Sequence, residues 1–489
     1  MTDRLVHDVD ATMQRSAEAF KAYKKVAGKK RAEFLTEIAA QLELNREELV
    51  TIAHEESNLP LPRLNGELTR TCNQLKMFAG LITEGSWVEA VIDKGDESRT
   101  PAKSDTRKML QPVGPVVVFG ASNFPFAFST AGGDTASALA AGCSVVVKAH
   151  PAHVKTSTKV FDSIKQAATQ TAMPEYILQH EIGAGNELGK TLVQHEITTA
   201  VGFTGSLHGG LALVGYANER RVPIPVFAEM GSVNPVVLLP DTLQLNAAAL
   251  AQKYAASVTL GMGQFCTNPG LLLGIKSEGL EQFIQALGNE VAEVFPAKML
   301  HKGISEAYNL GLIEKLSMQG VEVVGKSKLK AEELEGAPTI TKVSGKIFLQ
   351  NNQLQEELFG PYSLVVVCTD KTELIEVLQS VKGQLTTTVM ATDKDLNEHR
   401  DLVELQTSLA GRIILNDVPT GVEVCASMVH GGPYPATTDA RFTSVGTSAV
   451  KRWVRPVCYQ GFTDGLLPDE LKDNNPLGIW RLVDGSFKK

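Results

Sequence analysis

Cysteine is scarce and scattered in this chain of 489 residues, and no two cysteines have the Cys-x-x-Cys spacing of a zinc or redox site. The six are Cys72, Cys143, Cys266, Cys368, Cys425 and Cys458. Their spacing indicates neither a disulfide framework nor a metal site, so we predict no bound metal. A free, reactive thiol persists in the reducing cytoplasm, which is the location we expect.

Long apolar runs and basic clusters are also missing. No stretch approaches the roughly 18 apolar residues of a membrane span. The charged N-terminal segment lacks the apolar centre of a signal peptide. The net charge is −8 and no basic stripe is interleaved with aromatic residues, so neither a membrane nor a nucleic acid is an expected partner. With 43% hydrophobic and 21% charged residues, the composition is that of a globular protein long enough for two or three domains.

Most of the chain alternates short apolar runs with helical patterns. Residues 8–80 have the spacing of helices, residues 93–108 read as an exposed loop or arm, and the last 35 residues read as an irregular tail or arm. Strands are expected at 114–120, 144–148, 176–179, 198–203 and 225–229, with helices near 127–141, 156–169, 187–194 and 209–218, and the alternation resumes from about 231 to 420. This pattern predicts an α/β fold with parallel sheets covered on both faces, which bind ligands at the carboxyl ends of their strands.

Cys266 and Glu229 are the most informative residues. Cys266 lies in Gly-Met-Gly-Gln-Phe-Cys-Thr, where small neighbours leave room for a substrate, and Glu229 ends an apolar strand 37 residues upstream. A thiol nucleophile and a carboxylate that activates water are the parts of covalent acyl-enzyme catalysis. Taken alone, Cys266 could be a core residue and Glu229 a solvated strand end.

Further polar residues follow the expected strands, and each has a simpler reading. Asn123 could donate to an oxyanion or form a turn before proline. Gly205 and Ser206 open a helix that could hold a phosphate, or Ser206 is only its cap. Lys148 could meet a cofactor or end a strand in solvent. His430 could serve the site or pack in a loop.

Read together, these segments resemble the aldehyde dehydrogenase superfamily. The order is Asn-Phe-Pro, strand-Lys, Phe-Thr-Gly-Ser, Glu-Met-Gly, Gly-Gln-x-Cys-Thr and Glu-x-Phe-Gly-Pro, across roughly residues 10–460. The resemblance implies an aldehyde dehydrogenase-like fold with a Rossmann-like dinucleotide-binding domain (1–92 and 113–230), an α/β catalytic domain (231–454) and a small β oligomerisation arm with a tail (93–112 and 455–489). It also implies a homodimer or homotetramer.

The resemblance also implies roles. Cys266 matches the nucleophile, Glu229 the general base, and Asn123, with the Cys266 N–H, the oxyanion hole. The positions that match cofactor contacts are Lys148, Gly205, Ser206, Glu357 and Phe359, and His430 is a possible supporting residue. The implied activity is NAD(P)-dependent, hydrolytic oxidation of an aldehyde to a carboxylic acid through a cysteine thioester.

Within the superfamily, the chain is most similar to the 2,5-dioxopentanoate (α-ketoglutarate semialdehyde) dehydrogenase group, which makes 2-oxoglutarate. Pro151 stands where NAD-preferring members often carry a glutamate, so NADP is permitted. Leu207 and Leu211 stand where NADP-using relatives often carry arginine, so NADP and NAD both remain expected cofactors.

A short oxo-acid substrate needs a cation for its far carboxylate, and arginine suits a bidentate partner. Arg70 is the preferred anchor, with Arg63 seven residues before it on one helical face. The alternative for Arg63 is a surface pair with Glu67. Phe124, Phe128 and Phe265 are expected to line the aldehyde site, with core packing as their alternative.

Three other functions remain open at this point. A broad-specificity enzyme for aliphatic or aromatic aldehydes would use the same fold and the same nucleophile. An acyl-coenzyme A-forming enzyme is disfavoured because Glu229 is present as a base. A catalytically silent binding or structural protein is disfavoured by the intact Cys266, Glu229 and Asn123.

Overall fold

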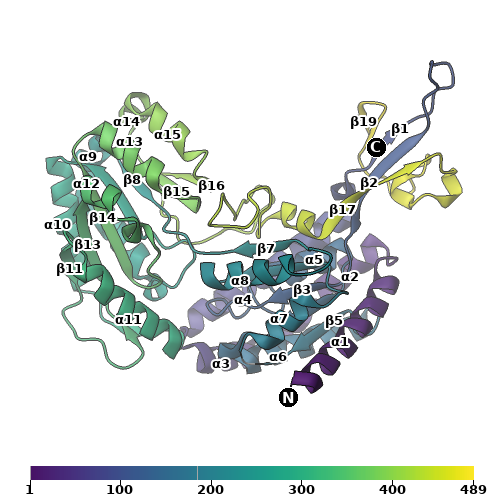
Figure 1. Ribbon diagram of the computed structural model, residues 1–489, viewed down its shortest axis with the longest axis horizontal. Helices are drawn as coiled ribbons and strands as arrows, with labels where there is room; N and C mark the ends of the chain where they lie inside the picture. The colour runs from purple at the N-terminus through teal and green to yellow at the C-terminus, as the bar shows by residue number, and fades with distance from the viewer. Residues whose placement is uncertain (1, 184) are drawn as a thin grey trace.

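The computed structural model describes residues 2–183 and 185–489, with side chains from Asp8 onward. Within these residues the chain builds three sheets of at least five strands and a small pair, β10 (Ala297–Lys298) with β12 (Glu335–Gly336). Figure 1 shows two of the large sheets inside two helix-covered lobes and the third projecting beside the C-terminus. None of the described helices is long and apolar enough to cross a membrane.

The first sheet has five parallel strands in the order β5-β4-β3-β6-β7. Its strands are β3 (Val116–Phe119), β4 (Val145–Lys148), β5 (Leu178–Glu181), β6 (Ala200–Thr204) and β7 (Val226–Glu229). The valine runs of β3 and β4 are buried, as continuous apolar strands of a covered parallel sheet should be. The strand order reverses between β3 and β6, and in such sheets this reversal point is where ligands bind.

Helices cover both faces of this sheet. The connecting elements are α5 (Gly133–Ala141), η2 (Pro151–His153), α6 (Val154–Gln170), α7 (Glu187–Gln194) and α8 (Leu207–Asn218). The N-terminal helices are α1 (Thr2–Tyr23), α2 (Gly28–Leu44), α3 (Arg46–Ser57) and α4 (Leu61–Glu84). Apolar side chains of α2 and α4, including Phe34 and Phe78, pack into the core that the sheet shares. The α/β prediction with parallel sheets is confirmed.

The helix expected from residue 127 begins six residues later than predicted. Residues 127–132 form turns, and α5 begins at Gly133. The backbone N–H groups of Phe126 and Ala127 donate to Glu67 Oε1 on α4, at 2.8 and 3.0 Å. These tertiary bonds satisfy the two amides outside a helix, so the local helical preference of the small residues does not decide this segment.

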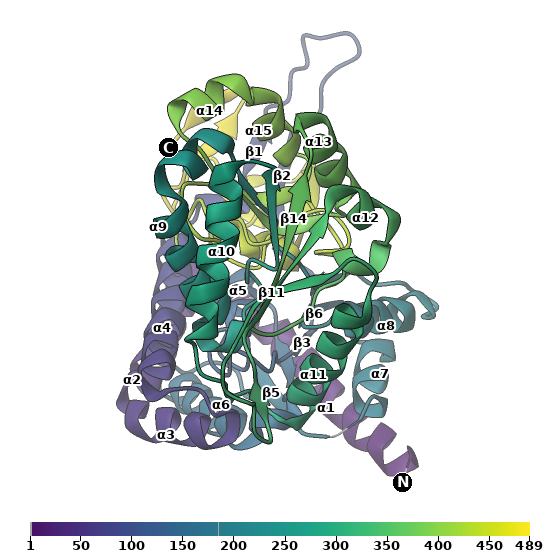
Figure 2. The same ribbon diagram turned by 90° about the vertical axis from the view of Figure 1, so that its left-hand side faces the viewer.

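The second sheet has seven strands in the order β11-β13-β14-β9-β8-β15-β16, all parallel except the β11–β13 pair. Its strands are β8 (Val236–Leu238), β9 (Leu271–Ile275), β11 (Glu322–Lys326), β13 (Thr339–Ser344), β14 (Tyr362–Cys368), β15 (Gln384–Met390) and β16 (Ala410–Leu415). The accompanying elements are α9 (Pro240–Thr259), η3 (Leu260–Gly263), α10 (Glu278–Ala292), α11 (Lys302–Ser317), α12 (Gly345–Gln350), η4 (Asn352–Gln355), α13 (Lys371–Ser380), α14 (Asp393–Glu398) and α15 (Arg400–Gln406). Figure 2 shows α9 and α10 in front of this sheet.

The third sheet joins segments from both ends of the chain in the order β17-β2-β1-β18-β19. Its strands are β1 (Val91–Asp93), β2 (Thr106–Pro112), β17 (Val454–Gln460), β18 (Arg481–Val483) and β19 (Ser486–Lys488), with short turns η1 (Ser86–Val88), η6 (Asp464–Leu466) and η7 (Asp469–Leu471) nearby. The prediction of an irregular tail is therefore wrong in part. Pro456 lies in β17, which is an edge strand, and an edge strand tolerates proline because one side of it needs no donor.

After β16 the chain returns to the first sheet. The Met230 N–H donates to Ala436 O at 2.8 Å, and the Thr438 N–H donates to Ala228 O at 3.1 Å. Further on, η5 (Thr447–Trp453) buries Trp453 in the core of the first sheet. This return brings residues 430–444 against the carboxyl end of β7.

Candidate active site

A tightly constrained turn presents Cys266. It follows η3, where Gly261, Met262 and Gly263 all have positive φ, of 54°, 56° and 62°. A Cβ on Gly263 would stand 2.1 Å from Gly360 O, so only glycine fits there. The buried Asn234 donates from Nδ2 to Cys266 O at 2.9 Å. The backbone that carries the thiol is therefore fixed before Cys266 by the glycine turn and at Cys266 by the bond from Asn234.

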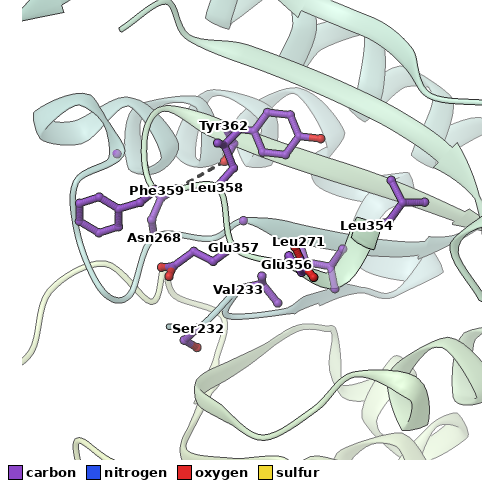
Figure 3. Close-up of a pocket in the computed structure, with 12 residues that line it drawn as sticks. Ser232, Val233, Asn268, Leu271, Leu354, Glu356, Glu357, Leu358, Phe359 and Tyr362 are labelled. Carbon is purple, nitrogen blue, oxygen red and sulfur yellow. Dashed lines mark hydrogen bonds between the residues drawn. The ribbon is translucent and has the colours of Figure 1, made fainter. Parts of the chain in front are cut away.

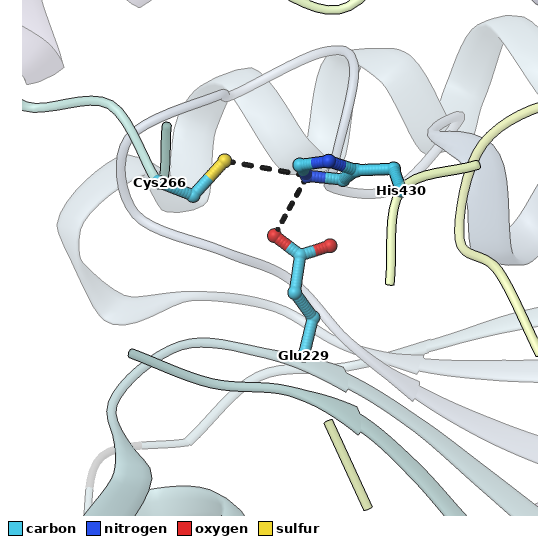
Figure 4. A group of neighbouring side chains, drawn as sticks. All are labelled: Glu229, Cys266 and His430. Atoms are coloured by element: carbon cyan, nitrogen blue, oxygen red, sulfur yellow. Dashed lines mark hydrogen bonds and ion pairs between the residues drawn. The ribbon is translucent and has the colours of Figure 1, made fainter. Parts of the chain in front are cut away.

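Glu229, Cys266 and His430 form one cluster (Figure 4). Glu229 Oε1 lies 3.0 Å from His430 Nε2, and Cys266 Sγ lies 3.4 Å from the same nitrogen. One ligand atom from each residue lies within 4.8 Å of the other two. Ser444 Oγ donates to Glu229 Oε2 at 2.8 Å and fixes the other carboxylate oxygen. The structure thus unites the predicted nucleophile and base and places His430 between them.

The electrostatics keep the proton on sulfur in this state. Burial, followed by the neighbouring Glu229 carboxylate, raises the pKa of Cys266 well above its ordinary value. Burial also raises the pKa of Glu229, but His430, Ser444 and Cys266 contacts outweigh it and leave that pKa lowered. The cluster therefore holds a thiol beside an ionised carboxylate that can accept its proton.

Asn123 follows β3 and lies close to the Cys266 turn. Its side chain is buried, and Nδ2 donates to Gln264 O at 3.2 Å, two residues before the nucleophile. An amide donor this close to the Cys266 turn is a candidate for holding an oxyanion on a carbon bound to sulfur.

The five residues expected at the aldehyde lie in one layer of arginines and aromatic rings. Phe124 contacts Phe128 and Phe265 with ring centroids 5.4 and 5.6 Å apart. Arg63 lies over Phe265 at 4.5 Å and Arg70 over Phe128 at 5.4 Å. The Phe128 ring in turn lies 6.1 Å from the ring of His430, so the layer continues to the catalytic cluster.

Within the described residues, only some N–H donors of these two guanidinium groups have hydrogen-bond acceptors. Arg63 Nη2 donates to Asn123 O at 2.9 Å, and Arg70 Nε donates to Val422 O at 3.3 Å. Arg63 Nε and Nη1, and both Arg70 Nη atoms, are buried without a hydrogen-bond partner. The alternative for Arg63, a surface pair with Glu67, is wrong in placing the pair on the surface, because Glu67 is buried and accepts from backbone amides, but the two charges do interact.

A cavity of about 490 Å³ lies between the lobes. Ser206, at the start of α8, and Gly231, Glu357 and Phe359 are among its lining residues. Figure 3 shows the Glu357 carboxylate close to Ser232 and Phe359. Desolvation by the surrounding protein, and then the charge of Glu229, raises the pKa of Glu357 to about 8, although the residue is exposed at the cavity wall. An acid in this position is suited to a polar ligand, so these residues fit the ribose of a nucleotide.

The other predicted cofactor residues lie at neighbouring strand ends. Ser206 caps α8 and accepts from Gly209 N at 3.2 Å, so the capping alternative holds, while the helix N-terminus still borders the cavity. Gly205 N donates to Glu229 O at 3.0 Å. Lys148 ends β4 with a buried side chain and Pro151 begins η2. Neither Lys148 nor Pro151 lines the cavity of about 490 Å³.

Two residues beside the site escaped the sequence reasoning. Arg412 on β16 donates to Gly421 O at 2.8 Å and acts electrostatically on Cys266, and its Nε is buried without a partner. A lone charge in the apolar run Gly411-Arg-Ile-Ile-Leu was the signal. Ser444 offered no comparable signal, because its role depends on the return of the chain to β7.

Comparison with known proteins shows the family to which the chain belongs. The model of the aldehyde dehydrogenase family matches residues 3–433. The alpha-ketoglutaric semialdehyde dehydrogenase 2 of Azospirillum brasilense is 45% identical over 479 residues, which are 98% of this chain and 91% of that protein. The alpha-ketoglutaric semialdehyde dehydrogenase of Acinetobacter baylyi is 45% identical over 480 residues, with the same coverage of 98% and 91%.

The fold is shared with solved structures. Betaine aldehyde dehydrogenase from Staphylococcus aureus, in complex with NAD⁺, superimposes with a TM-score of 0.79 over 93% of this chain and 87% of that one. At 19% identity this likeness concerns the fold alone. Since the family model covers most of the sequence, the resemblance drawn from the motifs is confirmed, and the chain belongs to the aldehyde dehydrogenase family.

Proposed function

We propose that this chain oxidises α-ketoglutaric semialdehyde (2,5-dioxopentanoate) to 2-oxoglutarate, with hydrolytic release of the acid. The observation that carries the choice of substrate is the pair of arginines beside Cys266 whose buried nitrogens lack partners. The two relatives that are 45% identical carry that activity in their names. The first and second sheets would belong to the cofactor-binding and catalytic domains, and the third sheet to an oligomerisation arm.

The first chemical step is attack by Cys266. Its thiol proton passes to the Glu229–His430 pair, whose Nε2 lies 3.4 Å from Sγ. Sulfur then adds to the aldehyde carbon, and the Asn123 amide with the Cys266 N–H holds the resulting oxyanion. Removing one such donor costs roughly 2.7–4 kcal/mol of transition-state stabilisation.

Oxidation of the carbon and release of the acid both take place while that carbon is bound to Cys266. Bound NAD⁺ or NADP⁺ supplies the acceptor for the hydride that leaves the carbon attached to Cys266. The product is a thioester on Cys266. The proton taken from the thiol has by then left to solvent, so Glu229, held by Ser444 and His430, is again a free base and takes a proton from water. The hydroxide attacks the thioester carbon, the C–S bond breaks, and the acid leaves while the Cys266 sulfur recovers a proton from the protonated pair.

The choice between the two nucleotides rests on few residues. Glu357 and Phe359 would contact the nicotinamide end, and Lys148, Gly205 and Ser206 the ribose and phosphates. Pro151 places no carboxylate where it would repel a 2′-phosphate. Leu207 and Leu211 are exposed on α8 and offer no cation to such a phosphate. Both nucleotides are therefore proposed as cofactors.

Recognition of the substrate's far end would come from Arg70 and Arg63. A guanidinium binds a carboxylate through two parallel N–H donors, and Arg70 has both Nη atoms free for this. The rings of Phe124, Phe128 and Phe265 would hold the short carbon chain. Glu67 already interacts with both charges, but the buried N–H donors without partners still carry a desolvation cost, which a substrate carboxylate would remove by accepting from them.

Substrate specificity tests the proposal. In Arg70→Met, kcat/KM for α-ketoglutaric semialdehyde should fall about 10- to 150-fold, because a hydrogen bond to a charged group contributes about 1.5–3 kcal/mol. For pentanal, which lacks the carboxylate, it should change little. Arg441→Met is the matched control, since the Arg441 side chain is exposed. Equal losses for both aldehydes would reject the anchor and favour a broad-specificity aldehyde dehydrogenase.

The same assay separates the acyl-coenzyme A-forming alternative. Hydrolytic turnover should proceed in buffer with nucleotide and aldehyde alone, because Glu229 activates water. Turnover that requires coenzyme A would contradict the proposed role of Glu229. Absence of nucleotide reduction with every aldehyde would favour a catalytically silent protein.

A further inference from the structure

The cluster around Cys266 has the composition of a zinc site with three protein ligands. Its atoms are one thiol sulfur, one imidazole nitrogen and one carboxylate oxygen, which are the three ligand types that Zn²⁺ takes from proteins. They come from positions 229, 266 and 430, which lie too far apart in the sequence for a metal-binding motif to predict the site. Zinc that keeps three protein ligands leaves a fourth position for water.

Two of the three ligand separations fit such an ion with small adjustments, and the third, between Cys266 Sγ and the Glu229 carboxylate, lies within 4.8 Å and would settle at about 3.6 Å around zinc. With zinc bonds of about 2.3 Å to sulfur and about 2.0–2.1 Å to nitrogen and oxygen, tetrahedral coordination separates sulfur and nitrogen by about 3.6 Å and nitrogen and oxygen by about 3.3 Å. The corresponding separations here are 3.4 Å between Cys266 Sγ and His430 Nε2 and 3.0 Å between His430 Nε2 and Glu229 Oε1. One nitrogen already faces both other ligand atoms (Figure 4).

The surroundings hold the ligands in place. Ser444 bonds the carboxylate oxygen that is not shared with His430, and a bond of this type orients a metal-binding carboxylate. The His430 backbone N–H donates to Thr443 Oγ1 at 2.8 Å. Arg70 and Arg412 lie near enough to affect Cys266, and their charges oppose a cation. A thiolate and a carboxylate neutralise the two charges of zinc, which limits that repulsion.

We infer that Glu229, Cys266 and His430 bind one Zn²⁺ per chain and that this binding reversibly blocks the nucleophile. A Zn–S bond forms as the S–H bond breaks, and the proton leaves to solvent. The metal's charge is unchanged, so no oxidant or reductant is involved. Magnesium and calcium, which prefer oxygen ligands, should not compete.

Metal stoichiometry on the purified full chain tests this inference. Protein freed of metal with a chelator is equilibrated with Zn²⁺, passed over a desalting column and analysed for zinc. The intact chain should retain one zinc per chain, and Cys266→Ser, His430→Phe and Glu229→Gln should each retain at least tenfold less. Cys458→Ser is the control and should retain one, because Cys458 is exposed on β17, outside the cluster.

Two measurements on the unaltered chain guard against misfolded variants. Co²⁺ used in place of zinc should give the near-ultraviolet charge-transfer band of a thiolate ligand. Zn²⁺ should also protect Cys266, but not Cys458, from alkylation by iodoacetamide, as read by peptide mass. Zinc retained equally by all variants, no zinc retained by the intact chain, or no thiolate band would each overturn the inference. None of these readouts uses aldehyde or nucleotide, so they stand apart from the proposed reaction.

Discussion

The protonation state of each acidic side chain at the site depends on its surroundings. Cys266 and Glu357 are both acids whose charged forms are disfavoured by desolvation and by the charge of Glu229, although Glu357 is exposed at the cavity wall. Glu229 itself stays ionised because His430 and Ser444 bond to its oxygens. One carboxylate therefore carries the charge, and its neighbours hold their protons until a ligand or a substrate changes their environment.

This arrangement predicts a pH dependence for nucleotide binding. The pKa of Glu357 is raised to about 8, so the nucleotide-free chain holds a proton there at neutral pH. A carboxylate that accepts bonds from ribose hydroxyls must release that proton. Affinity should thus rise by up to about tenfold per pH unit below pH 8 and level off above it. Calorimetric titration with the nucleotide at several pH values measures this.

Glu357→Gln is the matched control for this effect. The amide keeps the shape of the side chain but does not titrate, so its nucleotide affinity should be lower at alkaline pH and independent of pH. A flat profile in the unaltered chain would show that Glu357 does not bind the nucleotide as a carboxylate.

At the scale of elements, the turn before Cys266 is the most constrained segment. In Gly263→Ala the new Cβ would meet Gly360 O at 2.1 Å, and the φ of 62° is itself unfavourable for alanine. Overpacking of this kind costs about 1–3 kcal/mol. The variant should unfold at a lower temperature and lose activity, as measured by thermal denaturation and turnover.

Gly215→Ala is a control for this change. Gly215 lies in α8, and nothing stands within 4 Å of an added Cβ, so alanine should be neutral or slightly stabilising. Equal thermal stability of the two variants would contradict the steric argument.

A second element, the loop that carries Glu357, is tied to α11 by a buried lysine. Lys315 Nζ donates to Gln353 O and to Glu356 O, the latter at 3.0 Å, and burial lowers the pKa of Lys315 to about 8. Lys315→Met removes both bonds, and a hydrogen bond from a charged donor contributes about 1.5–3 kcal/mol. We expect KM for the nucleotide to rise several-fold while kcat changes less.

Steady-state kinetics at varied nucleotide concentration measures KM and kcat separately and so tests this expectation. Lys315→Arg keeps the donors and should restore part of the nucleotide affinity. A fall in kcat with KM unchanged would mean that the lysine does not act through the loop.

At the scale of the whole molecule, the third sheet projects beside the C-terminus (Figure 1), and apolar side chains on and next to its C-terminal strands are exposed. Trp480 and Phe487 are 50% and 75% exposed, and Leu466 is 72% exposed. Exposed apolar groups gathered on one projection are typical of an association surface. We expect a dimer or tetramer that the double change Trp480→Ser and Phe487→Ser converts to a smaller species.

Light scattering coupled to size-exclusion chromatography measures this mass. Leu245→Ser is the control, because Leu245 is 67% exposed on α9 and lies outside the third sheet. A monomeric parent chain, or the same loss of mass in the control, would contradict the expectation.

Prediction from the sequence worked where local pattern and burial agree. The valine runs of β3 and β4 predicted buried parallel strands, and the motifs around Cys266 and Glu229 predicted the family. Prediction failed at the start of α5, because the backbone N–H groups of Phe126 and Ala127 donate to Glu67, which lies 59 residues or more earlier in the chain. Local pattern failed again in the C-terminal segment, which reads as irregular but forms strands on partners nearly 400 residues earlier. Only the family resemblance had assigned this segment, together with residues 93–112, to a β arm.

The sequence by itself determined the α/β class, the motifs that resemble the family, and the small residues around the Cys266 thiol, because these follow from local pattern and residue chemistry. Only the tertiary structure decided that His430 stands between Glu229 and Cys266, that Ser444 and Arg412 join the site, and that two guanidiniums are left with unused donors. Those facts depend on the return of the chain from β16 to β7. Contacts between residues 164 to 215 positions apart leave no periodic signal in a sequence.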